Sequence, residues 1–191
     1  MHTYIQADVR WEYGGNTVKG RGKISGGGLS GCSMILDYSK LLSGGLPGLY
    51  ERVLTRRARA QEKGEDLDLF DGSLLALDIV RDVCLEYACQ AGELARNTDG
   101  AAAEGMRELQ KMLISITERA PETLREALQL CWIYAIVNFD FPEFARFDDV
   151  FARFYRHDID TGMLSKSSAE DLLLAFWNKM EQQGSRFADR V

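Results

Sequence analysis

The chain has 191 residues, 46% of them apolar, which is enough for a hydrophobic core in one domain of ordinary size. Its 23 basic and 29 acidic residues give a net charge of −6, which argues against nucleic acid because phosphates are neutralised by clustered Lys and Arg. No apolar run approaches the roughly 20 residues that cross a bilayer, and the N-terminus does not resemble a signal peptide, so we expect a cytoplasmic protein without a membrane partner.

The first 36 residues differ from the rest of the chain. Apolar and polar residues alternate weakly over residues 3–13, and this segment is rich in aromatic side chains, as in an edge strand. Glycines are dense from Gly14 to Gly31, and this density predicts turns or a mobile loop. We therefore expect a strand-and-loop segment over residues 1–36, with any strand confined to residues 1–35.

Helical patterns dominate residues 37–191, so the predicted fold class is mainly α. The expected helices cover residues 37–42, 46–62, 73–95, 101–117, 121–137, 147–158 and 166–180. Ser43-Gly44-Gly45 separates the first two, Pro121 occupies a first turn, and Ser165 caps the last helix. Steps of three and four predict these core residues: Leu77, Val80, Cys84, Tyr87, Ala88, Ala91, Leu94, Ala95, Leu124, Leu128, Cys131, Trp132, Ala135, Leu172, Leu173, Phe176 and Trp177.

The residue types that usually form metal or nucleophilic sites are sparse. Four cysteines and two histidines form no ligand cluster, so we expect no metal and assign no catalytic residue. Asp158 and Asp160 could begin a calcium loop, but its glycine falls at position five and its twelfth position is Ala169, which lacks the required carboxylate. A helix end at Gly162 explains this segment better.

Three segments carry a family resemblance. Asp37-Tyr38 begins a segment that continues to Leu49, and residues 120–132 form a second segment. The third begins at Arg146-Phe147-Asp148 and ends at Phe176-Trp177-Asn178-Lys179-Met180. Together, over about residues 31–180, they resemble the pyruvate formate-lyase-type domain of glycyl radical enzymes. In that family the third block occurs in the same register without a gap.

The resemblance implies an α/β barrel surrounded by helices, of which this chain would supply outer helices and little sheet. Asp37, Tyr38, Arg146, Phe147, Asp148 and Trp177 would be structural residues of the family motif. Family substrate loops align with Cys32, Ser33, Asn138 and Asp140, which are therefore the candidates for a substrate pocket.

The family parent would cleave a C–C, C–N or C–O bond in a small metabolite, after activation by a radical-SAM activase. Its thiyl cysteine and glycyl radical loops lie downstream of the matched segment, so we expect this chain to be a fragment that is inactive alone and binds no cofactor. We expect it to self-associate as a dimer or to bind the rest of the parent enzyme. The alternatives are a stand-alone helical protein that binds a partner and an unrelated helical domain with a chance match.

Overall fold

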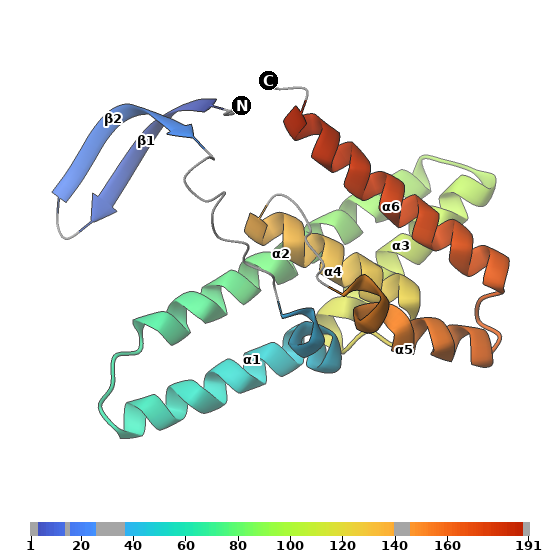
Figure 1. The fold of residues 1–191 in the computed structure, drawn as a ribbon, viewed down its shortest axis with the longest axis horizontal. Coiled ribbons are helices and arrows are strands. Elements are labelled where there is room, and N and C mark those ends of the chain that lie inside the picture. The colour runs from blue at the N-terminus through green and yellow to red at the C-terminus, as the bar shows by residue number, and fades with distance from the viewer. Residues whose placement is uncertain (1–3, 14–15, 26–36, 140–145, 189–191) are drawn as a thin grey trace. The chain divides into compact units, whose positions relative to one another are not determined.

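A computed structural model describes residues 4–13, 16–25, 37–139 and 146–188, with side chains for 37–137 and 146–182. It contains two strands followed by six helices in these ranges (Figure 1). The chain divides into two compact units, Leu36–Phe176 and Met1–Ile35 with Trp177–Val191. The prediction of a mainly α chain is confirmed.

The N-terminal hairpin pairs β1 (Tyr4–Tyr13) with β2 (Asn16–Ser25) in an antiparallel two-stranded sheet. The register runs from Tyr13 opposite Asn16 to Tyr4 opposite Ser25. The expected strand near residues 3–13 is confirmed, but Gly20 and Gly22 lie within β2 rather than in a turn or loop. A paired partner strand satisfies the backbone of β2, and this outweighs the weak strand preference of glycine.

The first helix, α1 (Tyr38–Glu62), is broken at Gly45, which has φ 64° and ψ −167°. This confirms the predicted interruption. A Cβ atom at position 45 would lie 2.8 Å from both the Cα of Ala120 and the carbonyl oxygen of Arg119. Arg153 donates a 2.7 Å hydrogen bond to the carbonyl of Leu42, just before the break. The break therefore lets α1 pack closely against the segment that follows α3.

The next two helices, α2 (Asp68–Arg96) and α3 (Gly100–Glu118), pack against each other over much of their length. The buried stripe of α2 contains Leu77, Val80, Cys84, Ala88, Ala91, Gly92 and Ala95. The prediction that Tyr87 and Leu94 are core residues is wrong, because each is 55% exposed. Small residues on α2 let α3 approach closely along a narrow stripe, where a Cβ at Gly92 would contact Gln110. The side chains on either side of this stripe therefore remain exposed to solvent.

The fourth helix, α4 (Leu124–Phe139), contacts α1, α2, α3 and α5 (Phe147–Asp160). Its predicted core residues Leu124, Leu128, Cys131 and Ala135 are buried. Trp132 is half-buried and meets Phe176 edge to face, with ring centroids 5.9 Å apart. Leu128 and Phe176 are 3% and 9% exposed, as expected for core residues.

The last helix, α6 (Lys166–Ala188), begins after the predicted cap, because the Ser165 hydroxyl accepts a 3.0 Å hydrogen bond from the Ser168 N–H. It continues beyond the expected end at Met180. Phe176 is buried as expected, whereas Trp177, also predicted to face inward, is 54% exposed. Adjacent helical residues diverge by about 100°, so a single core contact cannot cover both. Within the ranges described above, no helix is long and apolar enough to cross a membrane.

Candidate functional site at the start of α4

The structure does not test whether the four substrate-pocket candidates form a site. Cys32, Ser33 and Asp140 lie outside the described residues, and Asn138 lies in the last turn of α4 without a described side chain. The substrate-pocket assignment therefore stays a prediction.

Asp37 and Tyr38 are the first two of the six residues expected to be structural parts of the family motif. Asp37 caps α1, since its carboxylate accepts a 3.1 Å hydrogen bond from the backbone N–H of Lys40. The Lys40 side chain also bonds this carboxylate and lowers the pKa of Asp37. Tyr38 is buried, at 3% exposure. Both residues anchor the first turn of α1.

The third motif block contributes an aromatic cluster. The Phe147 ring lies 4.7 Å from the ring of Phe151 and 5.9 Å from that of Phe176, which joins α5 to α6. Arg146 and Asp148 form an exposed ion pair at 3.2 Å, and such pairs contribute little to stability. In this block the phenylalanines, rather than the charges, hold the helices together.

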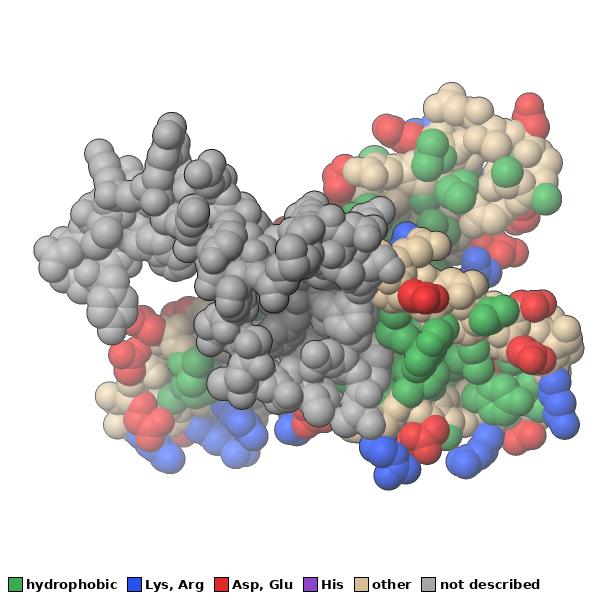
Figure 2. All heavy atoms as spheres, turned by 45° about the horizontal axis from the view of Figure 1, so that its top comes forward, with side chains coloured by type: hydrophobic (Ala, Val, Ile, Leu, Met, Phe, Trp, Pro, Cys, Tyr) green, Lys and Arg blue, Asp and Glu red, His purple; other side chains and the backbone are tan. Residues whose placement is uncertain are grey.

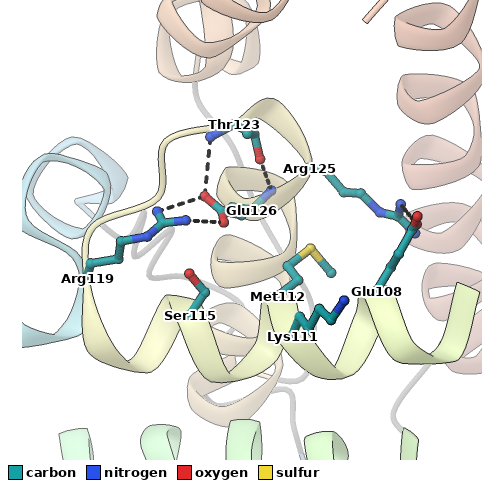
Figure 3. A pocket seen from close by; sticks show the side chains of 8 residues that line it. All are labelled: Glu108, Lys111, Met112, Ser115, Arg119, Thr123, Arg125 and Glu126. Carbon is teal, nitrogen blue, oxygen red and sulfur yellow. Dashed lines mark hydrogen bonds and ion pairs between the residues drawn. The ribbon is translucent and has the colours of Figure 1, made fainter. Parts of the chain in front are cut away.

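The most highly organised polar arrangement surrounds the start of α4 (Figure 3). Thr123 and Glu126 form a reciprocal capping box. The N–H of Glu126 donates to the Thr123 hydroxyl at 3.2 Å, and the N–H of Thr123 donates to the Glu126 carboxylate at 3.3 Å. The same carboxylate accepts a 2.8 Å bond from the N–H of Glu122. These bonds start the helix at Leu124, so the predicted start at Pro121 is wrong by three residues.

Arg119 holds the Glu126 carboxylate with both terminal nitrogens, at 2.6 and 3.1 Å. Burial by itself raises the pKa of Glu126, but hydrogen bonds from Arg119 and the backbone N–H groups of Glu122 and Thr123 outweigh it and lower this pKa. A carboxyl with a lowered folded pKa stabilises the fold above its unfolded pKa. That contribution is lost as pH falls through the folded pKa.

A second carboxylate reaches the start of α4 from a distant part of the chain. Asp158, in the last turns of α5, is 1% exposed and accepts a 2.8 Å hydrogen bond from the N–H of Leu124. Its other oxygen lies 3.2 Å from Nδ1 of His157. Negative charge is favourable at this end of a helix, where backbone N–H groups lack helical partners. Asp158 therefore ties α5 to α4.

Sequence reasoning missed this arrangement, although one signal was present. Thr123-Leu124-Arg125-Glu126 matches the Thr-x-x-Glu pattern of a capping box. Asp158 was considered only as a calcium ligand, and no local pattern indicates its partner 34 residues away.

A shallow pocket of about 380 Å³ lies between α3 and the start of α4 (Figure 3). Two Arg–Glu ion pairs border it: Arg119 with Glu126 at 2.6 Å, and Arg125 with Glu108 at 3.3 Å. The other lining residues are Lys111, Met112, Ser115 and Thr123.

Two of the three thiols in the helical unit, Cys84 and Cys131, are buried, whereas Cys89 is exposed on α2. Burial raises the pKa of Cys84 to about 11 and raises that of Cys131 well above its ordinary value. A buried thiol of high pKa is a poor nucleophile, because the thiolate is the reactive form. Among the residues with described side chains, no group of three or more His, Cys, Asp or Glu could hold a metal ion.

Comparison with known proteins identifies the family. The family model described as pyruvate formate lyase-like matches residues 27–187. A probable dehydratase of Escherichia coli K12, YbiW, is 28% identical over 177 residues, which are 85% of this chain and 21% of YbiW. The crystal structure of a glycyl radical enzyme from Archaeoglobus fulgidus has a similar fold, with a TM-score of 0.65 and 24% identity over 73% of this chain and 19% of that protein. The chain thus spans about a fifth of the length of these proteins, and it belongs to the pyruvate formate lyase-like family.

Proposed function

We propose that this chain supplies a helical part of a glycyl radical enzyme and does not carry out the radical chemistry by itself. The family match over residues 27–187 carries this proposal. The organisation around α4 supports it, because Glu126 and Asp158 are both engaged in capping the helix. These residues would serve as structural supports.

The complete enzyme would break a C–C, C–N or C–O bond in a small metabolite, as a lyase or transferase of anaerobic metabolism in the cytoplasm. The name of the Escherichia coli relative, a probable dehydratase, favours C–O cleavage, since dehydration breaks a C–O bond. A radical-SAM activase would be required to generate the glycyl radical in that enzyme. No cofactor is proposed for the residues of this chain.

The positions of the residues that could carry radical chemistry support this part of the proposal. A thiyl radical must contact the substrate C–H bond, and Cys84 and Cys131 are packed inside the helical unit. The described glycines with positive φ, namely Gly45, Gly64, Gly100 and Gly162, lie at a helix break or helix ends. The third described thiol, Cys89, is exposed on α2.

Electron paramagnetic resonance tests this proposal. The chain is incubated anaerobically with a radical-SAM activase, S-adenosylmethionine and a reductant, and a complete glycyl radical enzyme with the same activase serves as the positive control. We expect no doublet near the free-electron g-value from this chain. A doublet that collapses when the protein is labelled with α-deuterated glycine, together with substrate turnover, would overturn the proposal.

We further propose an association surface on the exposed side of α2, used either by a second copy or by the rest of the enzyme. Leu75, Ile79, Tyr87 and Leu94 are 62%, 48%, 55% and 55% exposed. Exposed apolar side chains also occur among charged ones on the face shown in Figure 2. Clustered apolar surface of this kind is typical of interaction sites.

Sedimentation velocity over a range of concentrations tests self-association. We expect a dimer that dissociates when Ile79→Glu places a charge on this surface. The matched control is Leu174→Glu on α6, a residue that is 58% exposed, and this variant should remain a dimer. A wild-type chain that stays monomeric at all concentrations would contradict self-association.

A further inference from the structure

The helices α1 and α2 lie side by side (Figure 1), and two bonds between them define one face of the pair. The Tyr50 hydroxyl donates to the Asp78 carboxylate, and Arg57 donates a 2.6 Å hydrogen bond to the Asp71 carboxylate. On each helix the two bonded residues are seven positions apart, which is about two turns. The helices therefore run antiparallel and in register here, with both bonds along the same side of their contact.

A leucine from each helix lies between the two bonds. On α1, Leu54 stands four residues after one bonded residue and three before the other, and Leu75 has the same spacing on α2. Because residues three and four apart share a side of a helix, both leucines lie on the face that the bonds define. They are 52% and 62% exposed, and Ile79, one turn further along α2, is 48% exposed. These three side chains form an apolar patch that the described residues leave exposed.

The apolar patch is surrounded by negative charge. Positions 75, 79, 82 and 86 recur at steps of four, three and four, so the stripe that begins with Leu75 and Ile79 continues with Asp82 and Glu86. Arg57 pairs with Asp71, and Arg81 pairs with both Asp78 and Asp82. Five carboxylates and two guanidinium groups therefore leave this face with a net charge of −3. The charged residues counted are Asp68, Asp71, Asp78, Asp82, Glu86, Arg57 and Arg81.

The other exposed arginines of α1 do not offset this charge. Arg52, Arg56 and Arg59 follow one another at steps of four and three along a different side of the helix. At 100° per residue they lie about 140–160° around α1 from Leu54. The patch thus combines apolar side chains with uncompensated carboxylates, and a complementary partner has both apolar and basic side chains.

We propose that the rest of the enzyme contributes a helix that binds this face, with apolar side chains on two successive turns and Lys or Arg on the next two. Its apolar turns would lie on Leu54, Leu75 and Ile79, and its basic turns would face Asp82 and Glu86. Amphipathic helices are commonly bound through anchors at such spacings. The chain spans 21% of YbiW, so a parent of similar length has many further segments that could supply this helix. The proposal names the partner of the association surface and rests on the proposed role in a larger enzyme.

Fluorescence anisotropy of labelled peptides, titrated with the full chain, tests the proposal. The probe is a capped, alanine-rich helical peptide with two leucines one turn apart and two lysines on the next two turns of the same side, made in both sequence directions. We expect saturable binding that weakens as salt is added. Two control peptides should bind at least about tenfold more weakly. One has glutamate in place of lysine, and the other has the same composition with the leucines and lysines spread around the helix.

Two variants, each with a matched control, locate the binding on this face. Leu75→Ser should raise the Kd about fivefold or more, whereas Leu174→Ser, at an exposed leucine of α6, should not change it. Glu86→Lys should raise the Kd about threefold to tenfold. Glu118→Lys makes the same change in net charge at an exposed position of α3 and should bind as the wild type does. All four positions are exposed, so the variants should remain folded, which circular dichroism checks.

The proposal is overturned if each variant and its control weaken binding equally, because the peptide would then respond only to overall charge or apolarity. It is also overturned if the glutamate peptide binds as tightly as the lysine peptides, or if no lysine peptide binds in a saturable manner. Sedimentation velocity distinguishes this failure from that of the association surface. A chain that dimerises through Ile79 but binds no basic helix has a second copy on this face. The radical measurement described above is independent of all these outcomes.

Discussion

Replacing Gly45 with alanine should lower the free energy of unfolding by about 3 kcal/mol or more, through two separate effects. The residue has φ 64° and ψ −167°, a backbone conformation that is essentially confined to glycine and costs other residues about 1–3 kcal/mol. The new Cβ would also lie 2.8 Å from two backbone atoms, at Arg119 and Ala120, and backbone cannot move aside as a flexible side chain can. Chemical denaturation measures the loss as a lower midpoint.

The neighbouring glycines provide matched controls for this prediction. No atom lies within 4 Å of the Cβ position at Gly44 or at Gly48, and both lie inside α1 without a positive φ. Alanine at either position should leave stability unchanged or raise it by about 0.5–1 kcal/mol, because glycine is a poor helix former. Equal effects of alanine at positions 44, 45 and 48 would contradict the close approach of α1 to the segment that follows α3.

Replacing Asp158 with alanine should cost about 2–3 kcal/mol, which is the second large effect expected. The substitution removes the acceptor for the Leu124 N–H, and that group is left in a buried position with no carboxylate to bond. It also removes negative charge from the N-terminus of α4. Thermal unfolding followed by circular dichroism measures the loss, and hydrogen exchange should show faster exchange of the Leu124 amide.

Two further variants separate the cap from other roles of this segment. Asp158→Asn keeps the shape and an acceptor oxygen, so it should recover part of the lost stability. Asp160→Ala alters an exposed carboxylate two residues away and should change stability by no more than about 0.5 kcal/mol. If Asp160→Ala and Asp158→Ala had equal effects, the capping role of Asp158 would be wrong.

Several features of the fold could be predicted because each depends on residues close together in the chain. The break at Gly45, the cap at Ser165 and the buried stripe of α2 follow from glycine conformation, side-chain capping and 3.6-residue periodicity. The ungapped block from Arg146 to Met180 was enough to indicate the family, and the family model confirms it.

Helical periodicity predicted too many core residues, because it does not give the width of the contact between two helices. Tyr87 and Leu94 fit the apolar pattern of α2, but α3 covers only a narrow stripe of small residues. Trp177 likewise fits the pattern of α6, while Phe176 occupies the inward position. A sequence pattern gives the direction of a side chain on its helix, and the distance to the neighbouring helix decides whether that side chain is covered.

The sequence by itself determined the mainly helical fold, the family and most of the helix boundaries, because these depend on local propensity and on a linear motif. Only the tertiary structure decided the polar arrangement at the start of α4. Asp158 reaches Leu124 across 34 residues, and the pocket beside Lys111 forms where α3 meets the capped first turn of α4. Such contacts depend on the packing of α5 and α3 around α4, which no local pattern in the chain encodes.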